Sequence, residues 1–182
     1  DGTVCRVGGK TLDQEGYDLM GLICGSEGLL GVITEVTAKI LKKPQVVKAA
    51  LIGFPTIEEG ANATSEIISS GIIPAGMEIM DKALIEATDN FSKAGYPRDA
   101  ELLLIVEVDG TESEVDVLLK DVSSICKKNN CSSLKLSQSE KERLSFWSGR
   151  KSAFPACGAM APDYYCMDGV IPRGKLAEAL LE

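Results

Sequence analysis

A glycine-punctuated turn is the strongest chemical signal in the sequence. Residues 25–34 read Gly-Ser-Glu-Gly-Leu-Leu-Gly-Val-Ile-Thr, so Gly25, Gly28 and Gly31 lie three residues apart. Glycine permits positive φ and lets the main chain approach a ligand closely. Successive backbone N–H groups in such a turn form a concavity that suits a pyrophosphate anion. A tight turn that leads into a strand explains the same residues without a ligand.

Two familiar nucleotide-binding loops do not fit this turn. A Rossmann loop has a different glycine spacing and is followed by a helix, whereas a strand is predicted to follow here. A Walker A loop closes with Gly-Lys-Ser or Gly-Lys-Thr, which this stretch lacks. Any nucleotide that the turn contacts must therefore belong to a different architecture.

A second signal lies on the helix that is predicted to begin after Ser139. Arg143, Phe146, Trp147 and Arg150 fall on one face of that helix. One interpretation is an amphipathic helix whose aromatic rings meet the core while both arginines reach solvent. The other is that the Arg150 guanidinium grips a substrate carboxylate bidentately, beside an aromatic wall. The residues alone leave both open.

Two weaker groups of polar residues accompany these signals. Asp163, Tyr164 and Tyr165 could face a substrate, or could form a strand edge with one inward tyrosine. Glu78 and Asp81 could form a metal or acid site, but Asp81 is explained equally well as a helix N-cap. We predict no metal site, because the six cysteines include no CxxC pair and the chain has no histidine.

Composition excludes several classes of protein. The formal net charge of −8 argues against nucleic-acid binding, which needs a basic surface. No apolar run approaches the length of a membrane span. Without histidine, hydrolytic triads and facial metal triads cannot be built from this chain alone. The cysteines are typical of buried or incidental thiols in a reducing cytoplasm. Because the first residue is Asp1 rather than Met, we expect an excised segment.

The elements that must position these residues fall into two parts, with a boundary near Pro44. Residues 1–43 are rich in glycine and include an alternating stretch, 32–40, that predicts a half-buried strand. The later residues alternate strands with helices and predict an α+β domain over 45–155. We prefer a ferredoxin-like mixed or antiparallel sheet with helices on one face; strict βαβ winding into a parallel sheet is the alternative. Strands are predicted over 46–54, 76–80, 102–108 and 133–136, with helices between them that begin near Thr56, Asp81, Thr111 and Ser139.

An ordered series of motifs resembles the vanillyl-alcohol-oxidase (p-cresol methylhydroxylase) type of FAD-binding protein. Within that superfamily it is most similar to the FAD-linked subunit of glycolate oxidase and related D-2-hydroxy acid dehydrogenases. The resemblance covers essentially the whole chain. Its motifs include Gly8-Gly9-Lys10-Thr11, the turn at 25–34, Met77 to Asp81, Leu104 to Gly110, Trp147-x-x-Arg150, Pro162 to Tyr165 and Asp168 to Arg173.

The resemblance implies a flavoenzyme that oxidises a 2-hydroxy acid, such as glycolate or D-lactate, to the 2-oxo acid. Residues 1–43 would end the split FAD-binding domain, and residues 44–182 would form the first part of the substrate domain. Arg150 would bind the substrate carboxylate, whereas a histidine outside this chain would take the hydroxyl proton, so no catalytic residue lies within it. The residues that would line the FAD, mainly through backbone groups, are Gly25, Ser26, Glu27, Gly28, Gly31 and Ile33, with the Glu27 carboxylate tying down the turn's amides.

Further expectations concern partners and alternatives. The resemblance also implies two partners, the remainder of the FAD-binding domain and an electron-acceptor subunit. We therefore expect this chain alone to be inactive and to bind FAD weakly or not at all. An ether-lipid synthase of the same superfamily is one alternative. A non-enzymatic α+β binding module is another, since fold alone does not assign function.

Overall fold

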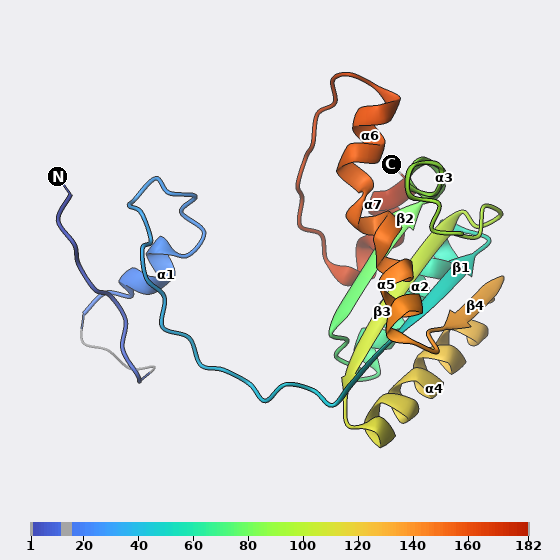
Figure 1. The fold of residues 1–182 in the computed structure, drawn as a ribbon, viewed down its shortest axis with the longest axis horizontal. Helices are drawn as coiled ribbons and strands as arrows, with labels where there is room; N and C mark the ends of the chain where they lie inside the picture. The colour runs from blue at the N-terminus through green and yellow to red at the C-terminus, as the bar shows by residue number, and fades with distance from the viewer. Residues whose placement is uncertain (1, 12–15, 182) are drawn as a thin grey trace. The chain divides into compact units, whose positions relative to one another are not determined.

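The computed structural model describes residues 2–11 and 16–181, and its contacts divide the chain into two compact units. The first comprises residues 1–42 and the second residues 43–182. Asp1, on which we based the expectation of an excised segment, lies outside the described residues. Figure 1 shows the elements of both units.

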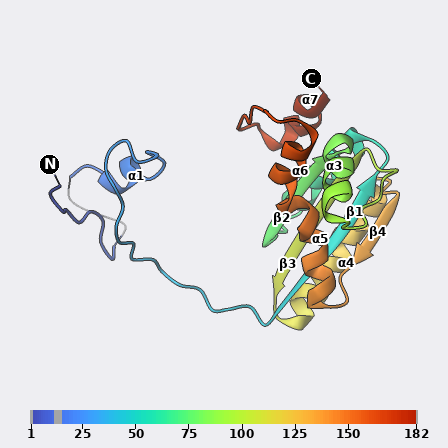
Figure 2. The ribbon, with the colours of Figure 1, turned by 45° about the horizontal axis from the view of Figure 1, so that its top comes forward.

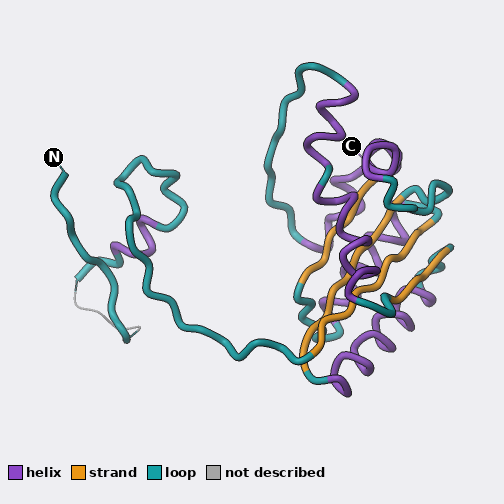
Figure 3. The backbone as a smooth tube through the Cα atoms, viewed as in Figure 1, coloured by secondary structure: helices purple, strands orange, loops and turns teal. Residues whose placement is uncertain are grey.

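The first unit has little regular structure. Its one helix in the described residues is α1 (Leu19–Ile23), where the Asp18 side chain accepts a hydrogen bond of 2.9 Å from the Gly21 N–H. The strand that we predicted over 32–40 is not formed, and Figure 3 shows this stretch as loop. Val36 and Ile40 of the predicted apolar face are 75% and 88% exposed. A strand is stable only when a neighbouring strand satisfies its backbone, and none of the described residues pairs with this one.

The second unit is built on a four-stranded sheet with the order β2-β3-β1-β4. Every neighbouring pair is antiparallel, so the parallel alternative is wrong. This order and direction are those of a ferredoxin-like sheet, with one additional helix between β2 and β3, and they confirm the predicted α+β class. The strands are β1 (Val46–Phe54), β2 (Gly76–Asp81), β3 (Leu102–Gly110) and β4 (Ser133–Leu136).

Four helices of this unit begin at the predicted N-cap residues. Each cap side chain accepts a hydrogen bond from the backbone N–H three residues on, which satisfies one of the free donors of the first turn. The helices are α2 (Ile57–Ser69, capped by Thr56), α3 (Lys82–Ser92, capped by Asp81), α4 (Glu112–Lys128, capped by Thr111) and α5 (Glu140–Lys151, capped by Ser139).

Both faces of the sheet are covered by helices, so the predicted placement of helices on one face is incomplete. One apolar cluster joins the sheet to α2 and α4, and a second joins its other face to α3 and α5. Figure 2 shows α3 and α5 in front of the strands. The cause lies in the central strands: residues 102–106 of β3 are all buried, and such a continuous apolar run needs cover on both faces.

The C-terminal part forms short helices and an irregular connection. Helix α6 (Ala153–Met160) follows α5 almost directly, and Pro155 lies in its first turn, where a backbone N–H is not needed. The strand-like stretch at 164–167 is loop instead. The chain then forms a 3-10 turn (Arg173–Lys175) and α7 (Leu176–Leu181). Across the described residues, no helix combines the length and apolar character that a membrane crossing requires.

Candidate functional site

Two carboxylates stand on the sheet face that α5 covers. The register of β2 against β3 pairs Gly76 with Glu107 and Glu78 with Ile105. Since side chains alternate across a strand, Glu78 and Glu107 share the face on which Ile105 is buried in the cluster beneath α5. Two negative charges at the margin of an apolar layer require cationic partners. Helix α5 supplies them.

Arg143 is a fully engaged cation. Its Nη1 donates to Glu107 Oε2 at 2.5 Å, and its Nε and Nη2 donate to the two carboxylate oxygens of Glu140 at 2.8 and 2.7 Å. These hydrogen bonds, first those with Glu140 and then that with Glu107, raise the pKa of Arg143. Its side chain is only 16% exposed, so the interpretation in which both arginines reach solvent does not hold for Arg143. Its role is to hold α5 to β3.

The aromatic residues of α5 meet the core, as predicted. Phe146 is buried, and Trp147 packs against the same cluster. The Trp147 indole N–H donates to Glu107 at 2.7 Å. A side chain at Gly76 would meet the Trp147 ring at 3.2 Å, so the indole lies directly over the sheet where β2 begins. The helix face is therefore fixed in place next to Arg150.

Arg150 differs from Arg143 in having an unoccupied hydrogen-bonding edge. Its Nε donates to Glu78 Oε2 at 3.0 Å, and its side chain is 35% exposed. Among the described residues, its two terminal nitrogens make no hydrogen bond. A guanidinium that is held by Nε and presents both terminal amino groups has the geometry for bidentate capture of a carboxylate. The structure thus places Arg150 at the margin of the α5 layer, with the N–H groups of its two terminal nitrogens free to bind a ligand.

Sequence reasoning missed two residues that build this environment, Tyr96 and Glu107. It named Glu78 but did not predict that Glu78 pairs with Arg150. Glu107 carried a usable signal, because it is an acid within an otherwise apolar predicted strand and such a residue needs a partner. Tyr96 lies in the connection between α3 and β3, where no periodicity relates it to α5. Its hydroxyl nevertheless contacts the α5 backbone at Phe146 and Arg150.

The glycine turn presents main-chain donors. Gly25 and Gly28 have φ of +81° and +80°, and Glu27 has φ of +50°. The Ser26 and Leu29 N–H groups bond within the turn, whereas those of Gly25, Glu27 and Gly28 have no partner among the described residues. Apart from the two chain neighbours, no atom of the described residues lies within 4 Å of where a side chain at Gly25, Gly28 or Gly31 would begin. Backbone N–H groups left open in this way can bind an anion.

The hydrogen bonds expected of Glu27 are not formed among the described residues. The Glu27 carboxylate makes no hydrogen bond to the amides of the turn among the described residues, so it does not tie them down. The turn closes instead through backbone bonds, from Ser26 to Ile23 at 3.1 Å and from Leu29 to Ser26 at 2.9 Å. Ile33 is largely exposed.

The remaining candidates do not converge on a site. Tyr164 and Tyr165 are exposed, and the Tyr164 ring lies 6.4 Å from that of Phe154. Asp81 is occupied as the cap of α3, accepting from Leu84 N at 2.9 Å. In the described part of the chain, no cluster of ligating side chains could hold a metal ion. Burial raises the pKa of the Cys126 thiol to about 12, which makes it an inert core residue.

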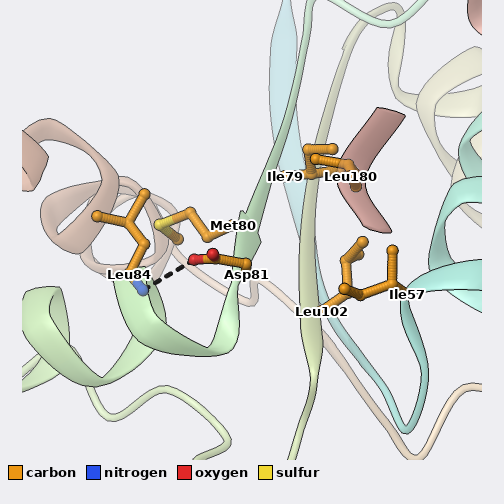
Figure 4. A pocket seen from close by; sticks show the side chains of 7 residues that line it. All are labelled: Ile57, Ile79, Met80, Asp81, Leu84, Leu102 and Leu180. Carbon is orange, nitrogen blue, oxygen red and sulfur yellow. Dashed lines mark hydrogen bonds between the residues drawn. The ribbon is translucent and has the colours of Figure 1, made fainter. Parts of the chain in front are cut away.

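An apolar cavity of about 280 Å³ opens at the other end of β2 (Figure 4). Asp81 is its one charged residue, and the figure shows the carboxylate turned toward the start of α3. Its lining offers no free acid, base or nucleophile, so it does not carry chemistry. It is lined by Ile57, Ile79, Met80, Asp81, Leu84, Leu102 and Leu180.

Comparison with known proteins identifies the family of the second unit and a solved structure with a similar fold. Residues 43–182 match the family described as FAD linked oxidases, C-terminal domain. The solved structure of alkyldihydroxyacetonephosphate synthase matches with a TM-score of 0.59 at 24% identity, and the match covers 82% of this chain and 31% of that one. This second likeness concerns the fold.

Curated relatives match almost the whole chain. The glycolate oxidase subunit GlcD of Escherichia coli K12 is 48% identical over 180 residues, which is 99% of this chain and 36% of the relative. GlcD of Bacillus subtilis is 34% identical over 178 residues, 97% of this chain and 38% of the relative. The mitochondrial D-lactate dehydrogenase [cytochrome] of Arabidopsis thaliana is 36% identical over 167 residues, 91% and 29% of the two chains. The chain thus spans between 29% and 38% of the length of these three relatives.

Proposed function

Because this chain belongs to the FAD linked oxidases, through their C-terminal domain, we propose that it works within a longer FAD-dependent enzyme that oxidises a 2-hydroxy acid to the 2-oxo acid. The names of the most similar relatives support this class of reaction. The observation that carries the proposal for this chain is the Arg150 guanidinium, held through Nε and open at its terminal nitrogens. The carboxylate is the one charged group of a small hydroxy acid, and the free terminal nitrogens of Arg150 can pair with it.

Arg150 would orient the substrate rather than take part in bond breaking. A bidentate pair fixes both the position and the plane of the carboxylate, and so aims the carbon that carries the hydroxyl. Glu78 contributes by restricting rotation of the guanidinium. Trp147 forms a rigid neighbouring wall because Glu107 and Gly76 fix its indole.

The glycine turn would supply the cofactor contacts of this chain. We propose that Gly25, Glu27 and Gly28 donate their N–H groups to FAD, while Ser26, Gly31 and Ile33 lie along it. FAD, when bound, supplies the acceptor for the two electrons of the oxidation. Residues 1–43 would accordingly be the end of an FAD-binding domain, and residues 44–182 part of the substrate domain.

The proposed setting is a cytoplasmic enzyme with an electron-accepting partner. GlcD is by name a subunit of glycolate oxidase, which supports the presence of a further subunit; we propose that this subunit takes electrons from the flavin. Exposed Cys5, Cys24 and Cys166, none of them in a disulfide, are compatible with a reducing compartment.

An ether-lipid synthase activity is the weaker candidate. The likeness to alkyldihydroxyacetonephosphate synthase is one of fold at 24% identity, whereas the hydroxy acid enzymes reach 48% over nearly the whole chain. Fold similarity at that level does not carry chemistry. The hydroxy acid reaction is therefore the better supported of the two.

The test is dye reduction by the full-length protein with glycolate, D-lactate and D-2-hydroxyglutarate. We expect at least one acid to be oxidised with saturation kinetics. In Arg150→Lys, KM for that acid should rise about 10- to 100-fold, because a lysine cannot form the bidentate pair. Arg143→Lys is the matched control on the same helix face: it should lower stability but leave KM within about twofold. Equal KM changes in both variants would contradict the assignment of Arg150.

A further inference from the structure

The hydroxyl of Tyr96 contacts both ends of one helical repeat in α5. It donates to the Phe146 carbonyl at 2.6 Å and accepts from the Arg150 N–H at 3.1 Å. These two groups are four residues apart, the pair that an α-helix joins directly. The Tyr96 hydroxyl therefore holds the last turn of α5 in place at Arg150, whose terminal nitrogens are free. Burial of Tyr96 raises the pKa of its hydroxyl, so the donor is retained across the neutral range.

The ring fits because residue 149 is glycine. A Cβ at Gly149 would lie 2.3 Å from Tyr96 Cε2 and 2.5 Å from its oxygen, distances that no side chain could accept. Gly149 is itself buried within α5 and precedes Arg150 directly. Tyr96 is thus inserted against the helix backbone rather than resting on its side chains. Movement of the ring would be transmitted straight to the backbone of Arg150.

Tyr96 is in turn anchored by a charged group. Asp89 Oδ1 accepts from the N–H groups of Gly95 and Tyr96 at 2.7 and 3.1 Å. Asp89 Oδ2 accepts from Nε and Nη2 of Arg98 at 2.9 and 2.8 Å. Asp89 is 6% exposed. A buried carboxylate with four donors holds the Tyr96 backbone rigidly, so the connection between α3 and β3 supports the end of α5.

We propose that Tyr96 is a positioning residue for substrate binding: through the Phe146 carbonyl and the Arg150 N–H it sets the direction of the Arg150 guanidinium. This inference rests on the proposed function, since it assigns Tyr96 a role in carboxylate capture. Two anchors then act on Arg150. Glu78 restrains the side chain at Nε, and Tyr96 restrains the backbone from which that side chain starts.

The test compares Tyr96→Phe, Arg150→Lys and the double variant in the full-length flavoprotein, with flavin content and KM for the hydroxy acid as readouts. Tyr96→Phe keeps the ring and removes both hydrogen bonds. We expect KM to rise about 3- to 10-fold, with kcat within about twofold, because an interaction made equally in the ground and transition states changes KM alone. In the Arg150→Lys background, Tyr96→Phe should raise KM no further.

Two control variants separate positioning from general loss of stability. Val122→Ala removes buried apolar contacts on the opposite face of the sheet, so it should lower stability without changing KM. Arg98→Lys weakens the support of Tyr96 from a half-exposed position and should raise KM in the same direction as Tyr96→Phe, by a smaller factor.

Each outcome decides between the two proposals. If Arg150→Lys raises KM and Tyr96→Phe does not, the positioning role is overturned and the function of Arg150 stands. Additive effects in the double variant, or a KM rise in Val122→Ala equal to that in Tyr96→Phe, also overturn it. If Arg150→Lys leaves KM unchanged, the carboxylate role falls and the role of Tyr96 falls with it.

Discussion

At the scale of single residues, the contrast between two arginines on one helix face decides which could meet a substrate. Arg143 and Arg150 are seven residues apart and face the same sheet surface. All three guanidinium nitrogens of Arg143 donate hydrogen bonds to Glu107 and Glu140, whereas only Nε of Arg150 donates one, to Glu78. The difference comes from the acids opposite them, not from the arginines themselves. Helical periodicity could therefore predict their shared face, but not which of the two stays available.

Asp89 gives a residue-scale prediction of pH dependence. Burial alone would raise the pKa of its carboxyl, but hydrogen bonds from Arg98 and from the Tyr96 and Gly95 amides outweigh burial and hold the pKa below 3.8. Because the folded pKa is depressed, the stabilisation is fully present above the unfolded pKa and is lost as pH falls through the folded value. The free energy of unfolding of the wild type should therefore fall as the pH drops below about 4, the ordinary pKa of an aspartate.

Asp89→Asn should remove the part of that dependence that comes from Asp89. The variant should be less stable by roughly 2 kcal/mol at neutral pH, because an amide cannot accept from all four donors. Its unfolding free energy should change less with acidification than that of the wild type. Urea unfolding, followed by the fluorescence of the single tryptophan, Trp147, measures both. Parallel pH curves for the two proteins would contradict the role given to Asp89.

At the scale of elements, features set by residues close in sequence, such as helix N-caps, could be predicted. Contacts between residues distant in sequence could not. The four N-caps of α2 to α5 were found from sequence because a cap and its partner lie three residues apart. The missing strand at 32–40 and the second helical layer depend on neighbours distant in sequence. Likewise Glu78 could be recognised as an acid on a strand, but its partner Arg150 is 72 residues away. Register and packing, not propensity, determine such contacts.

A pair of glycine substitutions tests the packing of α5 against Tyr96. Gly149→Ala would place Cβ 2.3 Å from the ring, so we expect a loss of roughly 1–3 kcal/mol in unfolding free energy from overpacking. Gly158→Ala is the matched control in the neighbouring α6, where the nearest side-chain atom is 3.8 Å away. It should be neutral, or should stabilise by up to about 1 kcal/mol. Thermal unfolding of both variants gives the comparison, and a Gly149→Ala protein as stable as the wild type would contradict the clamp.

At the scale of the whole molecule, the two units differ in how well each buries its apolar residues. The second has a layered core on both faces of its sheet, whereas the first leaves its apolar residues exposed. Sequence alone predicted a boundary near Pro44, because a glycine-rich segment ends there and an alternation of strands and helices begins. It could not predict that residues 32–40 form no strand, since strand formation requires a neighbouring strand and none of the described residues pairs with them.

The isolated chain should therefore hold little flavin. The glycine turn offers main-chain donors along one stretch of the cofactor, too few contacts to offset the cost of ordering the turn and FAD together. We expect chain 1–182, purified with excess FAD and then desalted, to retain far less than one flavin per molecule. The full-length protein, treated identically, provides the comparison. Stoichiometric flavin in the isolated chain would show that these contacts suffice.

The most direct test of the proposed reaction is anaerobic mixing of the full-length protein with glycolate or D-lactate while the absorbance of oxidised flavin is followed. We expect one of these acids to bleach the bound flavin completely, with one 2-oxo acid formed per flavin. The Arg150→Lys variant should require a much higher acid concentration for the same bleaching. A flavin that stays oxidised with both acids, or a protein that binds no flavin, would contradict it.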